Sequence, residues 1–303
     1  MSTSPAPRSR LARFGARAAV LAALAGSGLA AATPPGQGES GNPPSGEPNT
    51  RTLYGVFRDF RAHNVSNGHP DFGTTPTRGR ATYYGMAADT LDAEGNPVFA
   101  STGFKVLTPA RDSSGRPICP PRPYLEARVG DQPPLVETVP GGACTTAANF
   151  GQWFRDVAGV NTTYQFPITM VRNETTGMWV FDNDLWTQHA HVPGFGGNKV
   201  YEYTYELETT FVYDAEGQQV ITVGADDFLL LYIDGKLVAD LGGNHVMQEQ
   251  DVDLSRLTWL QDGQTYSLKI FYGERKKVDS WFKFVTNIEL GYVSPPETSG
   301  LYD

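Results

Sequence analysis

The sequence lacks the motifs that accompany the common catalytic chemistries. It contains no G-x-S-x-G nucleophile elbow, no H-E-x-x-H helix, no Walker loop and no C-x-x-C pair. Nucleophilic, proteolytic and nucleotide chemistry therefore have no positive support. The 33 acidic residues leave a polysaccharide hydrolase open as an alternative, but with so many acids some pair will satisfy almost any template of two facing carboxylates.

Long apolar runs are also scarce, and no stretch of about twenty apolar residues follows the N-terminal segment. The first 32 residues carry four arginines, no acid and an alanine-rich apolar stretch at positions 18–32. This pattern is typical of a secretory signal peptide, and Gly26 and Gly28 argue against an ordinary N-terminal helix. We predict a signal peptide at 1–32, no membrane span, and a secreted, extracellular or cell-surface protein of bacterial type.

Large apolar side chains are absent from residues 33–50, which consist only of Pro, Gly, Ser, Glu, Asn, Gln and Thr. Such a segment cannot bury enough apolar surface to fold, so we predict a disordered linker. The rest of the chain is expected to form one domain at 51–293, with a C-terminal tail at 294–303. No cysteine lies near the end of the signal peptide, so lipid anchoring has no acceptor.

Positive charge is in short supply. The chain has 24 basic and 33 acidic residues, and removal of the four leader arginines changes the net charge from −9 to −13. A strongly acidic protein repels the phosphate backbone, which argues against nucleic acid as a partner.

Only two cysteines occur, Cys119 and Cys144, and they flank a Pro- and Gly-rich segment. In an exported chain two such residues predict a disulfide. A metal-binding or redox pair is the alternative, but the close C-x-x-C spacing is missing.

What the sequence has in plenty is short alternating apolar runs between turns, which predict an all-β fold. We expect an antiparallel β-sandwich or barrel with an irregular N-terminal half. One short helix is expected in A-N-F-G-Q-W-F-R-D-V at 148–157, where Phe150, Trp153, Phe154 and Val157 follow helical spacing. The expected strands are 53–57, 81–87, 164–171, 178–181, 201–206, 210–212, 219–223, 228–233 and 237–238, one containing Tyr266, Leu268 and Ile270, and a last one with Phe282, Phe284, Ile288 and Leu290 on one face.

Two adjacent carboxylates, Asp226 and Asp227, precede the strand at 228–233, and Asp234-Gly235 is a hairpin turn signal that leads into the return strand. Asp240 and the loop G-G-N-H at 242–245 follow that strand. Hard oxygen donors at a strand end are the ligands that calcium prefers. The alternative is that these aspartates are turn formers, since the spacing is not that of an EF-hand loop.

Several ordered motifs resemble those of the fibro-slime domain. They are V-F-R-D-F from Val56, H-P-D-F from His69, F-G-Q-W-F-R-D-V-A-G-V-N from Phe150, F-D-N-D from Phe181, the hairpin D-D-F-L-L-L-Y-I-D-G-K-L-V-A-D-L-G-G-N-H from Asp226, and F-Y-G-E-R from Phe271. Together they cover about 53–290. The C-terminal half, at 195–293, is also similar to the lectin-like β-barrel domain named after bacterial protective antigen.

This resemblance implies that Asp226 and Asp227 are joined by a cis peptide and hold calcium, which in turn binds sugar hydroxyls. Asn244 is the best candidate for a further amide or carbonyl ligand, and His245 and Asp240 are candidate neighbours. The family more often has three consecutive acids, and Ala225 stands in place of the first here. Trp281 is a candidate for stacking on a sugar ring, because it alternates with the inward-facing Phe282.

The sequence thus predicts an exported, non-catalytic module for calcium-dependent carbohydrate binding or adhesion, with a cell-surface or matrix glycan as its partner. One alternative is a structural matrix or surface-coat protein that contacts other matrix proteins and binds no sugar. A polysaccharide hydrolase is the third reading.

Overall fold

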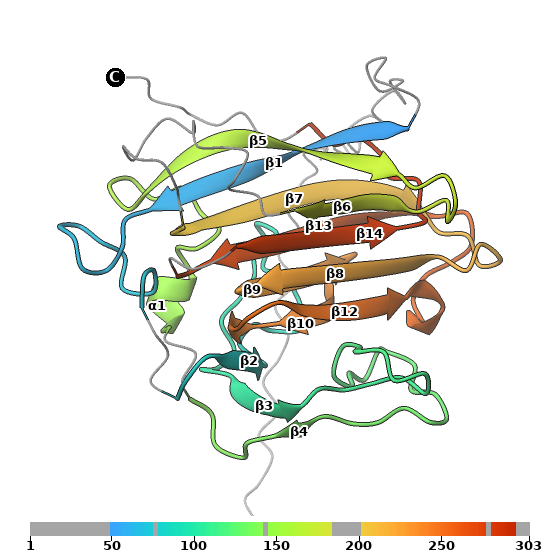
Figure 1. Cartoon of the computed structure of the whole chain (residues 1–303), viewed down its shortest axis with the longest axis horizontal. Helices are drawn as coiled ribbons and strands as arrows, with labels where there is room; N and C mark the ends of the chain where they lie inside the picture. The colour runs from blue at the N-terminus through green and yellow to red at the C-terminus, as the bar shows by residue number, and fades with distance from the viewer. Residues whose placement is uncertain (1–48, 75–77, 142–144, 184–200, 277–279, 295–303) are drawn as a thin grey trace, which may run out of the picture. The chain divides into compact units, whose positions relative to one another are not determined.

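The structure is a computed structural model that describes residues 49–74, 78–141, 145–183, 201–276 and 280–294 (Figure 1). All of them belong to the larger of two compact units, Ser40–Asp303. The predicted signal peptide, all but the last two residues of the predicted linker and residues 295–303 lie outside this description. Within the described residues, no helix is both long and apolar enough to cross a membrane.

One antiparallel sheet contains most of the strands, which confirms the predicted all-β class. In spatial order its strands are β10 (Lys236–Leu241), β9 (Phe228–Ile233), β13 (Thr265–Glu274), β7 (Tyr203–Val212), β1 (Thr50–Phe60), β5 (Asn161–Arg172), β6 (Trp179–Asn183), β14 (Trp281–Thr286), β8 (Val220–Asp226) and β12 (Gln248–Asp253). The first strand in sequence, β1, therefore lies in the middle of the sheet, between β5 and β7 (Figure 1).

The two edge strands, β10 and β12, are joined through one side chain. The Gln250 amide accepts a hydrogen bond from the backbone N–H of Asp240 at 2.8 Å and donates one to the Asp240 carbonyl oxygen at 3.0 Å. Gln250 is buried, so its amide reproduces the pairing that a neighbouring strand would supply. This contact brings the sheet close to a closed barrel.

Strand β9 explains why the apolar run at 228–233 does not alternate. Leu229, Leu231 and Ile233 face the main core, whereas Phe228, Leu230 and Tyr232 face a second core. The second core includes Phe60, Phe72, Met86, Phe150, Trp153 and Phe154 from the N-terminal half. A strand covered on both faces is expected to be apolar throughout. The N-terminal half thus covers the outside of the barrel at this point.

A second, smaller sheet has the order β11 (Gly243–Asn244), β2 (Ala81–Tyr84), β3 (Phe104–Thr108) and β4 (Leu135–Val136). Its β11–β2 pairing places Asn244 opposite Ala81. Gly243 permits this close approach, because it has a φ of +116° and a Cβ there would lie 2.5 Å from the Ala81 carbonyl oxygen. Residues just before β2 are therefore held beside Asn244.

The short helix predicted within 148–157 is present, but it begins one residue earlier and is much shorter than the aromatic stripe. Helix α1 spans only Ala147–Phe150, and Thr146 caps its N-terminus. The polar backbone groups at 155–157 bond to the Asn161 side chain instead of to a further helical turn. Asn161 accepts from the Val157 N–H at 3.1 Å and donates to the Arg155 carbonyl oxygen at 2.8 Å. The aromatic stripe is nevertheless core, since Phe150, Trp153 and Phe154 are buried.

Strand extents differ from the sequence prediction in several places, of which two change the interpretation. The expected strands at 201–206 and 210–212 are parts of the single strand β7. The last strand, β14, ends at Thr286, and Ile288 and Leu290 reach the core from the segment that follows it. Thr286 ends the strand locally, because its Oγ1 accepts from the Ile288 N–H at 3.1 Å and turns the chain.

Candidate metal and carbohydrate site

Asp226 and Asp227 lie where β8 passes into β9, and the peptide bond between them is cis. Both residues are buried, with 4% and 0% of their surface exposed. Tyr272 on β13 fixes this junction, because its hydroxyl donates a 2.6 Å hydrogen bond to the Asp226 carbonyl oxygen. The predicted position of the acids at a strand end is confirmed.

A third carboxylate, that of Glu274 at the end of β13, meets the pair. One ligand oxygen from each of Asp226, Asp227 and Glu274 lies within 4.8 Å of the others. Burial, together with the charge of Asp227, raises the pKa of Glu274 well above its usual range. Its Oε2 atom is buried and has no hydrogen-bond partner among the described residues. A buried oxygen without a donor is the kind of group that a cation would satisfy.

Asn244 joins the acids from β11. Its Nδ2 donates to Asp227 Oδ2 at 3.0 Å, so its Oδ1 is turned away from that carboxylate oxygen. The backbone N–H of Arg275 donates to the same Asp227 oxygen at 3.1 Å. Two donors thus hold one oxygen of Asp227 and leave Oδ1 for another partner.

That partner is Arg80, which immediately precedes β2. Its Nη2 lies 3.1 Å from Asp226 Oδ1 and 3.3 Å from Asp227 Oδ1. The same guanidinium contacts Asn244 Oδ1 at 3.1 Å through Nε, and the His245 carbonyl oxygen at 3.4 Å through Nη2. A single positive group therefore touches oxygens of four residues that converge on one point.

The donor set fits calcium. Calcium takes six to eight oxygen ligands, which carboxylates, side-chain amides and backbone carbonyls supply. The convergent residues offer three carboxylates, the Asn244 amide oxygen and the His245 carbonyl oxygen. The sequence departure at Ala225 takes no ligand away, because Ala225 is fully buried on the interior face of β8 and belongs to the main core.

The other predicted site residues lie at different distances from this centre. His245 is buried, burial lowers its pKa, and its ring nitrogens lie 2.9 Å and 3.0 Å from the carbonyl oxygens of Val246 and Leu241. Its contribution to the centre is therefore the backbone oxygen. Asp240 lies elsewhere, because its carboxylate accepts from Arg122 at 2.8 Å and from the Gly85 N–H at 2.9 Å.

Trp281 is the register partner of Asp226 across β14 and β8. It is half-buried on the face opposite the fully buried Phe282, as the alternation predicted. Its Nε1 donates to Asp182 Oδ1 at 2.6 Å, and its ring covers Gly224, where a Cβ would come within 2.5 Å of it. An aromatic ring thus lies on the same side of the sheet as Asp226.

Sequence reasoning missed Arg80 and gave Glu274 no role. Glu274 had a signal, since it is the one acid at the end of the apolar run Ile270–Tyr272 on β13, within the F-Y-G-E-R motif. Arg80 had none, because its contacts span 146 to 165 residues of chain.

Three of the sequence motifs contact one another next to the site: H-P-D-F, the motif that starts at Phe150, and F-Y-G-E-R. Asp71 of H-P-D-F accepts from Thr145 Oγ1 at 2.6 Å, Asn149 Nδ2 at 3.1 Å and Trp153 Nε1 at 2.9 Å. Arg275 stacks over Trp153, with its guanidinium carbon 4.7 Å from the ring centre, and donates to the Gly243 carbonyl oxygen at 3.2 Å. These contacts connect the motifs to β11, which carries Asn244.

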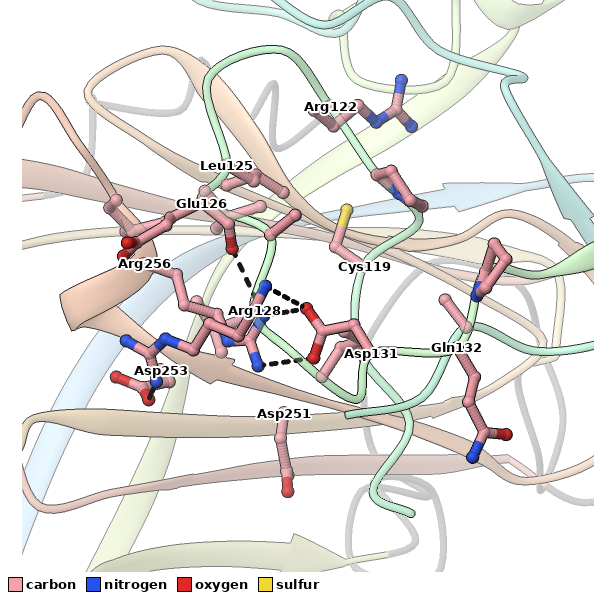
Figure 2. A pocket seen from close by; sticks show the side chains of 18 residues that line it. Cys119, Arg122, Leu125, Glu126, Arg128, Asp131, Gln132, Asp251, Asp253 and Arg256 are labelled. Carbon is pink, nitrogen blue, oxygen red and sulfur yellow. Dashed lines mark hydrogen bonds and ion pairs between the residues drawn. The ribbon is translucent and has the colours of Figure 1, made fainter. Parts of the chain in front are cut away.

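A separate cavity of about 300 Å³ lies between the 110–133 segment and the barrel (Figure 2). Its lining includes the apolar side chains of Leu125, Val238 and Leu257. Arg256 pairs with Asp131 at 2.6 Å, and Arg128 pairs with Asp253 at 2.7 Å (Figure 2). Because these charges are already matched in pairs, the cavity has fewer unpaired polar groups for a ligand than the cluster of Asp226, Asp227 and Glu274, which we call the acidic centre.

Cys119 lines this cavity and is a free, buried cysteine in the structure. Its predicted partner, Cys144, lies outside the described residues. The structure therefore shows no disulfide at Cys119, and the pairing stays a prediction.

Comparison with known proteins finds similarity over part of the chain. The PA14 domain family model matches residues 182–299, which include Asp226, Asp227, Asn244 and Glu274. The protein psiP of Dictyostelium discoideum is 32% identical over 139 residues, which are 46% of this chain and 16% of psiP. The chain spans less than a third of the length of this relative and of psiC, another protein from the same organism.

Two solved structures are also similar. The PA14 domain of the MpAFP antifreeze protein has 14% identity and a TM-score of 0.25, covering 36% of this chain and 60% of that one. The PA14 sugar-binding domain from an RTX adhesin has 10% identity and a TM-score of 0.26, covering 80% and 99%. The resemblance to the fibro-slime domain stays a prediction. Strands β1 and β5 lie outside the PA14-matched residues, although they lie between strands of the same sheet.

Proposed function

We propose that this chain is an exported, non-catalytic module that binds carbohydrate through a calcium ion held by Asp226, Asp227 and Asn244. Glu274 and the His245 carbonyl oxygen are further candidate ligands. The observation that carries the proposal is the convergence of three buried carboxylates within 4.8 Å. The PA14 match supports carbohydrate binding and adhesion, and the matched residues include all of these candidate ligands. The role of the His245 carbonyl oxygen is suggested by the geometry alone.

The bound calcium would supply a positive centre for neighbouring sugar hydroxyls. The chain's own residues would orient it: the Arg275 N–H and the Asn244 amide hold one oxygen of Asp227, so the other is directed to the metal. Trp281 lies on the same side of the sheet as Asp226 and offers a ring face to the C–H surface of a saccharide.

The arrangement of the acids favours binding over hydrolysis. A glycosidase places two carboxylates on opposite sides of the scissile bond, about 5 to 9.5 Å apart. Here the three acids converge on one point and are buried. That geometry suits metal coordination, in which several oxygens face a single ion.

The test is calorimetric titration of calcium into the chelator-treated protein, followed by a glycan array with calcium and with EDTA. Asp227→Asn is expected to weaken calcium binding at least about a hundredfold, because a charged ligand is replaced at the centre of the site. Asp234→Asn is the matched control, since Asp234 is an exposed acid in the turn of the same hairpin.

Failure of the wild-type protein to bind calcium at millimolar concentration would remove the basis of the proposal. Calcium binding without retention of any glycan would favour a structural matrix or surface-coat protein. Release of reducing ends from a polysaccharide would establish a hydrolase instead.

A further inference from the structure

We infer that Arg80 is a built-in competitor of calcium: its guanidinium occupies the acidic centre in the metal-free protein and has to leave when the ion enters. This inference rests on the proposed function, because it concerns the same site. Arg80 would thereby set the apparent calcium affinity of the site, and so the calcium concentration at which the site fills.

The contacts of Arg80 coincide with the ligands expected for the ion. Asp226 Oδ1, Asp227 Oδ1, Asn244 Oδ1 and the His245 carbonyl oxygen all lie 3.1 to 3.4 Å from its nitrogens. Calcium would approach the same oxygens to 2.3 to 2.6 Å. Two cations cannot share these oxygens at such distances without strong repulsion, so occupancy by one excludes the other.

The position of Arg80 is fixed by the fold rather than by chance contact. Ala81, the next residue, pairs with Asn244 through β2 and β11, and Tyr83 N–H donates to the Gly242 carbonyl oxygen at 2.7 Å. The backbone that carries Arg80 is thereby tied to the loop that carries the amide ligand. The β2–β11 pairing that positions Asn244 therefore also positions the guanidinium next to the acids.

The side chain can nevertheless leave. About 26% of the Arg80 side chain is exposed, whereas those of Asp226 and Asp227 are 6% and 0% exposed. Its contacts of 3.1 to 3.4 Å are longer than the 2.7 to 2.9 Å typical of charge-assisted hydrogen bonds. Rotation of the side chain toward solvent would free all four oxygens without moving β2.

Two consequences follow from competition. With no calcium present, Arg80 neutralises part of the charge of two buried carboxylates, so its removal should destabilise the metal-free protein. In a variant that lacks Arg80, calcium no longer has to displace a resident cation. Its apparent affinity should therefore rise, because the whole population is then competent to bind rather than only the fraction from which Arg80 has moved away.

The experiment compares wild type, Arg80→Gln and Arg78→Gln by calcium titration calorimetry and by thermal unfolding in EDTA and in calcium. Arg78→Gln is the matched control, because Arg78 carries the same charge two residues away and pairs with Glu137 and the Val139 carbonyl oxygen instead. For Arg80→Gln we expect calcium binding about tenfold tighter or more, a lower Tm in EDTA, and recovery of Tm in calcium.

Equal or weaker calcium binding by Arg80→Gln, alongside clear binding by wild type, would overturn this inference and leave the proposed function intact. Binding by Arg80→Gln but not by wild type would support the competition by Arg80 and overturn the proposed function, because the native site would then not be loaded with calcium. Binding by neither protein would overturn both. Should Arg80→Gln not fold, Arg80→Met, which keeps an apolar stem and removes the charge, replaces it: tighter calcium binding than wild type supports competition, and unchanged or weaker binding contradicts it.

Discussion

Asp71 and Trp153 are joined by a 2.9 Å hydrogen bond from the indole Nε1 to the carboxylate Oδ2, although 82 residues separate them in the chain. Both residues are buried, and the bond joins the segment after β1 to the segment after α1. Arg275 stacks on the same indole and donates to the carbonyl oxygen of Gly243. The Asp71–Trp153 pair therefore helps to hold β11, which carries Asn244.

Replacement of Asp71 by Asn is expected to lower the free energy of unfolding by roughly 2–3 kcal/mol. Three side-chain donors converge on its two oxygens, and an amide would turn an NH₂ group toward at least one of them. Urea denaturation measures the change. Asp214→Asn is the control, because Asp214 is an exposed acid whose turn contacts an Asn side chain also makes. Equal stability of the two variants would show that the Asp71 contacts contribute little.

Asp59 on β1 should give the protein a stability that falls with rising pH. Burial, and then the charge of Glu202, raise its pKa to about 8, although a hydrogen bond from the Phe60 backbone opposes the shift. The folded protein therefore keeps a proton that the unfolded chain releases near the ordinary value of 3.8. The resulting stabilisation is complete below that value, decreases as pH rises above it, and is lost once pH passes about 8.

The measurement is the free energy of unfolding in urea between about pH 5 and about pH 9. Asp59→Asn, which cannot ionise, is expected to flatten the decline and to be the more stable protein at the alkaline end. Glu216→Gln, at an exposed position, should follow the wild-type curve. A decline of the same slope in Asp59→Asn would assign it to another group.

Cys119 should be unreactive in the folded protein. Burial raises the pKa of its thiol to about 12, and the neighbouring Arg122 offsets only part of that shift. The thiolate, which is the reactive form, is therefore scarce at neutral pH. Thiol labelling followed by mass spectrometry should find Cys119 unmodified in native protein, and a free Cys119 would be modified in denaturant without reductant. A disulfide with Cys144 would block labelling in denaturant until a reductant is added.

Local signals predicted the hairpin well. The apolar run at 228–233, the Asp234-Gly235 turn and the return strand are all present, and both turn residues have positive φ values, of +50° and +71°. Such a unit depends on neighbouring residues alone, so turn chemistry and apolar pattern are sufficient to define it. The position of the acid pair followed from the same signals.

Strand β12 was not predicted because its sequence, Q-E-Q-D-V-D, is polar. It lies at the edge of the sheet, where only Gln250 and Val252 are buried, so little apolar pattern is needed. The Arg80 contact could not be predicted for a different reason: it depends on the β2–β11 pairing, which brings together residues more than 160 positions apart. Partner choice at that separation is decided by the whole fold and leaves no local pattern.

The central place of β1 also sets an order of events during synthesis. Among the described residues, Thr50–Phe60 is the first strand to be made, but its neighbours end at Arg172 and Val212. One edge of β1 therefore has no partner until about two thirds of the chain has been translated, and an open edge is a template for pairing with other chains. Folding that depends on such distant pairings is slow. We therefore expect chain concentration and the presence of chaperones to govern the yield of correctly folded protein more strongly than the stability of the finished barrel does.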